Sequence, residues 1–313
     1  MAKKEPIVLN GQQIGRFKAS LLLFKETYRY FKADKEMVWI PLIMGVVNIF
    51  LFGAIVAVFV LTILGGDIQL SAEGEPSSPL ELVFFFACYV AGAFTLALSQ
   101  AAIVHTVYTR AHGGDATLTD SLKVAWSHAG SLFLWSVITS TVGIVLRMIV
   151  ERSRFLGFIL ALVVGVAWSV LTYFVVPAMV IDKKSAFGSI GKSGQVFKQT
   201  WGETLVSNFG LGLTFLGIHL LALLSFIGLA IACAVVDLAV LVIPLVIVYV
   251  VFIVILGLIQ SAMEGILKTL LYIYGAEGAV PENFNRDLLE SMLVRKAVPS
   301  ADQDISQPSQ LHQ

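Results

Sequence analysis

Long apolar stretches separated by polar segments set the pattern of this chain. Four of them cover Val38–Leu64, Leu80–His105, Leu132–Val150 and Phe155–Ile181. A further block, from Leu205 to Gln260, is too long for one membrane span and suits two that turn back near Ala232–Asp237. About 20 helical residues cross the roughly 30 Å hydrocarbon layer of a bilayer. The pattern therefore predicts six transmembrane helices.

A short stretch with helical periodicity precedes the first, third and fifth predicted spans. Its apolar positions recur every three or four residues: Phe17, Leu21, Phe24, Tyr28 and Phe31; then Leu118, Leu122, Ala125, Ala129 and Leu132; then Phe187, Ile190, Gly194, Phe197 and Trp201. This spacing places apolar side chains on one face of a helix, which can then lie in the headgroup layer. We therefore expect an all-α polytopic membrane bundle of three units, each an amphipathic helix followed by a helical hairpin. The alternative is that these stretches are ordinary polar loops.

Composition agrees with a membrane protein. Of 313 residues, 57% are hydrophobic and 13% are charged, and mean hydropathy is +0.85, whereas soluble domains carry about 25% charged residues. The first apolar stretch is too long for the core of a secretory signal, so we expect it to stay in the membrane. We expect an N-terminal segment with an interfacial helix at 1–37, a membrane domain at 38–275, and a C-terminal segment with a short helix and a disordered tail at 276–313.

Lys and Arg residues fall almost entirely on one side of the predicted spans. All but three of the 21 lie in the N-terminal segment, in the links after the second and fourth spans, or after the sixth. The link at 65–79 has none and carries Asp67, Glu73 and Glu75. Because cytoplasmic loops carry the excess of Lys and Arg, we expect both termini in the cytoplasm. The exceptions, Arg147, Arg152 and Arg154, are expected at the outer interface.

The sequence lacks the spacings that mark catalytic or nucleotide sites. Gly188, Gly191 and Gly194 recur every third residue, but no strand precedes them, so we interpret them as close-packing positions and not as a phosphate loop. No GxSxG, HExxH or CxxC motif is present. We therefore expect no catalytic residue and no cofactor, and we do not expect an enzyme or a nucleic-acid partner.

Potential metal ligands are also scattered. The histidines near the second link are His105, His112 and His128, with Asp115 and Asp120 close by in the sequence. None of these pairs has the spacing of a metal site. Cys88 and Cys233 lie within apolar stretches and predict neither a disulfide nor a metal site.

Polar residues inside the predicted spans are a better candidate, because they are costly in lipid and often functional. His219 lies near the middle of the fifth span, and residues of similar depth are Asn48, Thr95, Ser169 and Tyr249. A polar layer around His219 and Tyr249 would suit a solute or proton path. A hydrogen bond between His219 and the Tyr249 hydroxyl would equally well hold helices together, which is the interpretation we favour.

A second candidate site lies where the third short helix is expected to turn into the fifth span. It contains Trp201, Gly202, Glu203 and Asn208. Trp is typical of the membrane interface, Gly allows close approach of a backbone, and Glu in a first turn favours the positive end of a helix. We predict either a structural corner or a site for lipid or a partner protein.

The block from Asp115 onward resembles a family of six-helix membrane proteins of bacteria and archaea classed only as a domain of unknown function, DUF6159. The segments that carry the resemblance are TWGE with Asn208 and Gly210, and the LYIYGAEG stretch that begins at Leu271. The resemblance implies a helical membrane fold and a place in the inner (cytoplasmic) membrane of a prokaryote. The pattern of short helices before hairpins is also similar to the membrane domains of glycerophosphodiester phosphodiesterases, but their soluble catalytic domain has no counterpart here.

Two classes of function remain open from the sequence. The first is a non-enzymatic membrane protein that binds or organises lipid or partner proteins at the cytoplasmic face, where anionic headgroups attract Lys and Arg. The second is a small-solute transporter or channel that uses the polar layer around His219. Membrane lipids are the expected partners, with a homo-oligomer or other membrane proteins as further ones.

Overall fold

The computed structural model describes residues 7–9, 12–14, 16–33, 35–65, 79–152, 156–200, 210–235 and 238–278. Within them, six helices are long and apolar enough to cross a membrane, as predicted. The helices that form these spans are α2 (Trp39–Leu64), α3 (Pro79–Ala111), α5 (Ala129–Arg152), α6 (Leu156–Leu171), α9 (Gly210–Val235) and α10 (Val242–Glu277).

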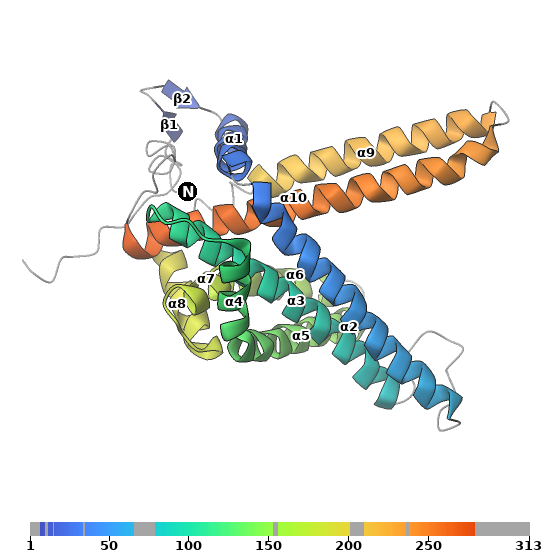
Figure 1. Ribbon diagram of the computed structural model, residues 1–313, viewed down its shortest axis with the longest axis horizontal. Helices are drawn as coiled ribbons and strands as arrows, with labels where there is room; N and C mark the ends of the chain where they lie inside the picture. The colour runs from blue at the N-terminus through green and yellow to red at the C-terminus, as the bar shows by residue number, and fades with distance from the viewer. Residues whose placement is uncertain are drawn as a thin grey trace, which may run out of the picture.

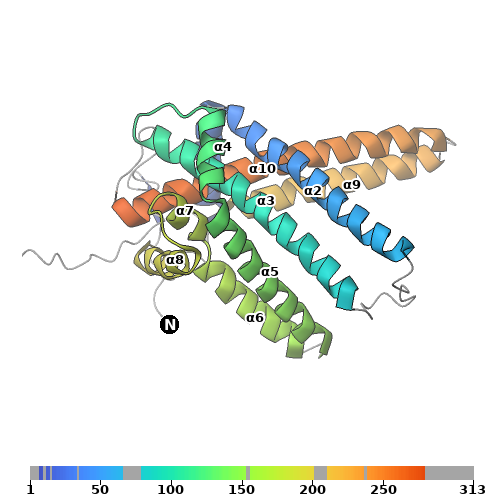
Figure 2. The ribbon, with the colours of Figure 1, turned by 60° about the horizontal axis from the view of Figure 1, so that its bottom comes forward.

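Three shorter helices precede the hairpins that these long helices form. They are α1 (Arg16–Ala33), α4 (Leu118–Ser127) and α8 (Ala186–Thr200), followed by the hairpins α2–α3, α5–α6 and α9–α10. Figures 1 and 2 show the hairpins spreading apart from the end of the molecule at which the shorter helices gather. The predicted all-α architecture of three helix-plus-hairpin units is therefore confirmed.

A small β-hairpin near the N-terminus was not predicted. Its strands, β1 (Ile7–Leu9) and β2 (Gln12–Ile14), are antiparallel, with Ile7 opposite Ile14. Asn10 and Gly11 lie between them in the sequence, and Asn-Gly is the dipeptide most favoured in two-residue hairpin loops.

The main buried core lies at one end of the molecule, outside the splayed part of the hairpins. Helices α3 and α10 have 33 and 36 residues, which is about 50 Å or more at 1.5 Å per residue and exceeds a hydrocarbon layer of roughly 30 Å. Their excess length packs with α1, α4, α7 (Val175–Val180) and α8. We call this assembly the hub: these four short helices and the link between α7 and α8, with α3 from Ala97 and α10 from Ala262. The splayed hairpins, in contrast, expose apolar side chains along most of their length, as helices that face lipid do.

The fourth predicted span, Phe155–Ile181, is confirmed over Gly157–Val180, which covers both α6 and α7. It is interrupted within its length, since α6 ends at Leu171 and α7 begins at Val175. Pro177 accounts for the interruption, because its ring removes a backbone donor and clashes with the preceding turn. Ser193 of α8 bonds the backbone there: its hydroxyl donates to the Leu171 carbonyl at 2.6 Å and accepts from the Phe174 N–H at 3.0 Å.

Helix α8 buries a face that differs by one position from the predicted one. Ala186, Ser189, Ser193 and Val196 are buried, whereas Phe187 is 66% exposed. Small side chains face the core because α8 packs closely on its neighbours. A Cβ built on Gly194 would lie 2.9 Å from Cδ1 of Leu171, which confirms close packing there, whereas nothing lies within 4 Å of one built on Gly191.

Candidate functional site

Four polar side chains recur at every fourth residue along the hub end of α10. They are Gln260, Glu264, Lys268 and Tyr272. Residues four apart lie one above the other on the same face of a helix. The stripe runs from the membrane part of α10 into the core of the hub, where Tyr272 is fully buried.

Two other segments of the chain meet this stripe. Lys268 Nζ donates to Oε1 of Gln100 on α3 at 3.3 Å and lies 5.1 Å from the centre of the Tyr173 ring, in the turn between α6 and α7. Gln260 Nε2 donates to Glu264 Oε1 at 2.8 Å. We call Gln100, Tyr173, Gln260, Glu264 and Lys268 the crossing cluster, because it lies where α3 and α10 cross.

Helices α3 and α10 come close at a glycine. A Cβ on Gly265 would lie 2.8 Å from Cγ2 of Ile103 on α3. Any larger residue at position 265 would therefore push the helices apart. The tight crossing holds Gln100 and Lys268 within reach of each other.

Each of the two charged side chains of the crossing cluster contacts a glutamine. Glu264 and Lys268 are four residues apart in the order that favours an ion pair. Within the described part of the chain, however, no ion pair within 4.0 Å joins them, and each contacts a glutamine instead. All four of these side chains are partly exposed. Ionisable groups near membrane depth are costly and typical of functional sites.

The distance of the cluster from the far ends of α3 and α10 can be compared with the thickness of a bilayer. Lys268 is 26 residues beyond the start of α10 at Val242 and Gln100 is 21 beyond Pro79. At 1.5 Å per residue these are about 39 and 31 Å along each helix. A hydrocarbon core is roughly 30 Å thick, and a bilayer with its headgroups about 40–45 Å. If both helices start at one hydrocarbon boundary, these lengths bring the cluster to the opposite boundary or into the headgroup layer beyond it.

A serine, a histidine and an aspartate also meet between α3 and α4, but they do not form a catalytic arrangement. Ser121 Oγ lies 3.3 Å from His105 Nδ1 and 2.7 Å from the Thr106 hydroxyl. Ser121 is fully buried, so no substrate reaches it. Asp120 accepts from the Thr117 hydroxyl and its N–H donates back to that oxygen, which begins α4. The network holds α4 against α3.

The described parts of the chain contain no group of three residues able to hold a metal ion. His112 contacts Glu277 across the hub, with 3.2 Å between Nε2 and Oε2. Its Nδ1 lies 2.9 Å from the Tyr108 carbonyl. The pair joins the ends of α3 and α10, and because both side chains are well exposed it adds little stability.

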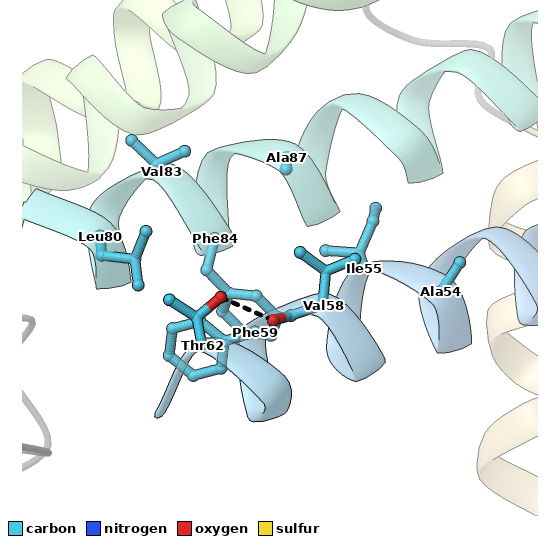
Figure 3. A pocket seen from close by; sticks show the side chains of 9 residues that line it. All are labelled: Ala54, Ile55, Val58, Phe59, Thr62, Leu80, Val83, Phe84 and Ala87. Carbon is cyan, nitrogen blue, oxygen red and sulfur yellow. Dashed lines mark hydrogen bonds between the residues drawn. The ribbon is translucent and has the colours of Figure 1, made fainter. Parts of the chain in front are cut away.

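An apolar groove of about 340 Å³ lies between α2 and α3, far from the hub. Figure 3 shows Phe59 and Phe84 within it, and their rings stack at 4.1 Å. The only hydroxyl in its lining belongs to Thr62, which donates to the Val58 carbonyl of its own helix. The groove thus offers hydrocarbon contacts and no group that would recognise a polar ligand.

The structure separates the two predicted intramembrane residues. His219 Nδ1 lies 2.8 Å from the Phe215 carbonyl of its own helix, and Tyr249 stacks on Phe226 with ring centres 4.4 Å apart. Phe226 is seven residues beyond His219, about 10 Å along α9. Tyr249 therefore lies beside a different level of α9, and His219 and Tyr249 do not form a pair.

Two other residues named for the polar layer do meet, although no bond between them was predicted. Asn48 of α2 donates to the Thr95 hydroxyl of α3 at 2.7 Å, which joins the helices of the first hairpin. The second candidate site, with Trp201, Gly202, Glu203 and Asn208, lies outside the described residues, and so does the C-terminal segment beyond 278.

The crossing cluster was not predicted from the sequence. A usable signal was present, because Gln260, Glu264 and Lys268 have a strict spacing of four directly after the sixth apolar stretch. The partners Gln100 and Tyr173 could not have been chosen in this way, since only the packing of α3, α7 and α10 brings them to the stripe.

The fold and its six apolar helices define a multi-pass helical membrane protein. A model of the family of unknown function DUF6159 matches residues 80–281. The chain belongs to this family. No curated protein and no solved structure matches the chain.

Proposed function

We propose that this protein is a non-enzymatic membrane protein that binds and organises anionic lipids at the cytoplasmic face through its hub. The observation that carries the proposal is a pair repeated on or directly before the helices α1, α4 and α8. An exposed Lys is followed three residues later by an exposed aromatic side chain: Lys25 and Tyr28, Lys123 and Trp126, Lys184 and Phe187.

Each pair has the two components of an interfacial anchor. The aromatic rings are 45%, 64% and 66% exposed at Tyr28, Trp126 and Phe187, which is unfavourable in water but typical of the headgroup boundary. In α1 and α4 the Lys three residues away lies on the same side of the helix, whereas Lys184 lies two residues before the start of α8. Each Lys can extend its ammonium to a lipid phosphate. An anionic leaflet attracts roughly 1 kcal/mol per such Lys.

The distribution of basic residues supports the cytoplasmic orientation in this proposal. The exposed Lys and Arg residues of the hub include Lys25, Arg29, Lys32, Lys123, Lys183, Lys184 and Lys198. At the opposite ends of α5 and α6, Arg147 is balanced by Glu151 at 2.7 Å. The excess of Lys and Arg at the hub favours the cytoplasm for that end.

Native mass spectrometry with phosphatidylglycerol tests the proposal. Replacing Lys25, Lys123 or Lys184 by Gln should weaken retention of this lipid about fivefold each, as expected for roughly 1 kcal/mol. Arg147→Gln, an exposed cation far from the hub, is the matched control and should have no such effect. Equal retention in all four variants would refute the proposal, and loss of a co-purifying protein instead of lipid would indicate a partner protein.

The alternative function is a small-solute transporter or channel. The break between α6 and α7 favours it, because interrupted helices often border transport sites. A path through the His219 layer would require water around that side chain. Reaction of His219→Cys, in a background without Cys88 and Cys233, with a water-soluble maleimide would support this alternative, and protection of that thiol would support the lipid-binding proposal.

A further inference from the structure

We propose that the crossing cluster binds the headgroup of a phospholipid that carries both a phosphate and a primary ammonium group. The proposal rests on the lipid-binding function above and adds a zwitterionic site to it. The phosphate would contact Lys268 and the ammonium would contact Glu264. Glu264 and Lys268 each contact a glutamine, and the cluster lies between helices of two different hairpins.

Glu264 and Lys268 carry opposite charges on the same face of α10. An exposed Glu and Lys at this spacing would ordinarily pair with each other. Here Gln260 holds the Glu264 carboxylate at 2.8 Å, and Gln100 contacts the Lys268 ammonium at 3.3 Å. One negative and one positive group therefore remain side by side on one face of α10. A phosphate and an ammonium joined by two carbons present the complementary pair.

The aromatic ring of the cluster, Tyr173, lies beside the Lys268 ammonium. The Lys268 ammonium lies 5.1 Å from the centre of the Tyr173 ring, a favourable cation–π distance. Tyr173 is held in the turn that Pro177 and Ser193 create between α6 and α7. The ring therefore orients the ammonium, and this contact leaves other donor positions of the ammonium for a phosphate.

A lipid can reach the cluster from the surface of the protein. Gln100, Gln260, Glu264 and Lys268 are all partly exposed. Lys268 contacts Gln100 of α3 and the ring of Tyr173 in the α6–α7 turn, so the cluster lies among α3, α10 and the end of α6. The membrane parts of α6 and α10 expose mostly apolar side chains. Acyl chains can lie against these apolar surfaces while the headgroup reaches the cluster.

The two charges of the cluster also select among lipid headgroups. Glu264 and Lys268 balance each other, so an extra anion gains less here than on the lysine-rich surface of the hub. A primary ammonium donates hydrogen bonds to a carboxylate, whereas a quaternary ammonium has no N–H to donate. A lipid such as phosphatidylethanolamine should therefore bind in preference to phosphatidylglycerol and phosphatidylcholine.

Native mass spectrometry of the full chain with each of these three lipids tests the proposal. The lysines of the hub bind phosphatidylglycerol independently of the cluster, so the retention that depends on Lys268 is measured: it should be largest for phosphatidylethanolamine. Lys268→Gln should reduce its retention about tenfold, the loss expected for one charge-assisted hydrogen bond, and should also reduce retention of phosphatidylglycerol. Glu264→Gln should remove the preference for phosphatidylethanolamine over phosphatidylglycerol while binding of phosphatidylglycerol persists.

Two further variants separate ligand binding from folding. Lys268→Arg keeps the charge and should retain phosphatidylethanolamine, and Lys123→Gln should leave the selectivity of the cluster unchanged. Lower melting temperatures for Lys268→Gln and Glu264→Gln with wild-type lipid selectivity would overturn the proposal and make the cluster a structural contact. A wild-type preference for phosphatidylglycerol at this site would also overturn it. Neither result would affect the tests on Lys25, Lys123 and Lys184, so the two proposals fail separately.

Discussion

Gly265 of α10 lies directly against Ile103 of α3, so that a Cβ at position 265 would be 2.8 Å from Cγ2 of Ile103. This contact fixes the crossing of the two longest helices. It also explains why their hub ends share a buried core while their outer ends separate.

Gly265→Ala should therefore destabilise the protein by about 1–3 kcal/mol, the usual cost of overpacking, measured as thermal unfolding in detergent. Gly257→Ala, on the same helix with nothing within 4 Å of the new Cβ, is the control and should be neutral or stabilising by up to about 1 kcal/mol. Combining Gly265→Ala with Ile103→Ala should cost less than the sum of the single changes. A fully additive result would show that the two residues do not meet.

The Asn48–Thr95 hydrogen bond makes a second prediction. It joins α2 and α3 at 2.7 Å within their apolar part, where such bonds contribute about 0.6 kcal/mol on average and up to about 1.7. Asn48→Leu should lower thermal stability by an amount in this range. Thr62→Val is a suitable control, because the Thr62 hydroxyl bonds only within its own helix. Equal melting temperatures for Asn48→Leu and the wild type would contradict the prediction.

Ser193 makes a third prediction, because one hydroxyl bonds two backbone groups at the break between α6 and α7. Ser193→Ala removes both hydrogen bonds, each of which contributes about 0.5–1.5 kcal/mol. The melting temperature should fall clearly below that of Ser127→Ala, whose exposed hydroxyl contacts only the Val124 carbonyl and the adjacent His128 ring. A change no larger than in that control would show that the break does not depend on Ser193.

The sequence was sufficient for the helices, because their signals are local. The lengths of the apolar stretches predict the spans, and spacings of three and four residues place α1, α4 and α8 ahead of the hairpins. The break at Thr172–Phe174 had a local cause in Pro177, yet a proline near the end of a span can also be accommodated. The backbone groups at this break are bonded by Ser193, about twenty residues away on α8.

The candidate sites were harder to predict, because they depend on contacts between distant segments. His219 and Tyr249 were paired by depth, but their antiparallel hairpin places Tyr249 beside Phe226. Gln100 and Lys268 meet only because Gly265 allows α3 and α10 to approach. The small buried face of α8 was missed because apolar periodicity gives weight to Phe187, whereas Ser189 and Ser193 fit the tight contact.

The last prediction concerns orientation, on which the proposed function depends. The hub carries most of the exposed Lys residues, so it should face the cytoplasm. In a background in which Cys88 and Cys233 are replaced by Ala, an impermeant maleimide should label Glu151→Cys on intact cells, since Glu151 is exposed at the end of α5 far from the hub. Lys123→Cys and Lys184→Cys, both exposed on the hub, should react only after the cells are permeabilised. Labelling of the hub positions on intact cells would reverse the orientation, and the lysine–aromatic pairs would then face the outer leaflet.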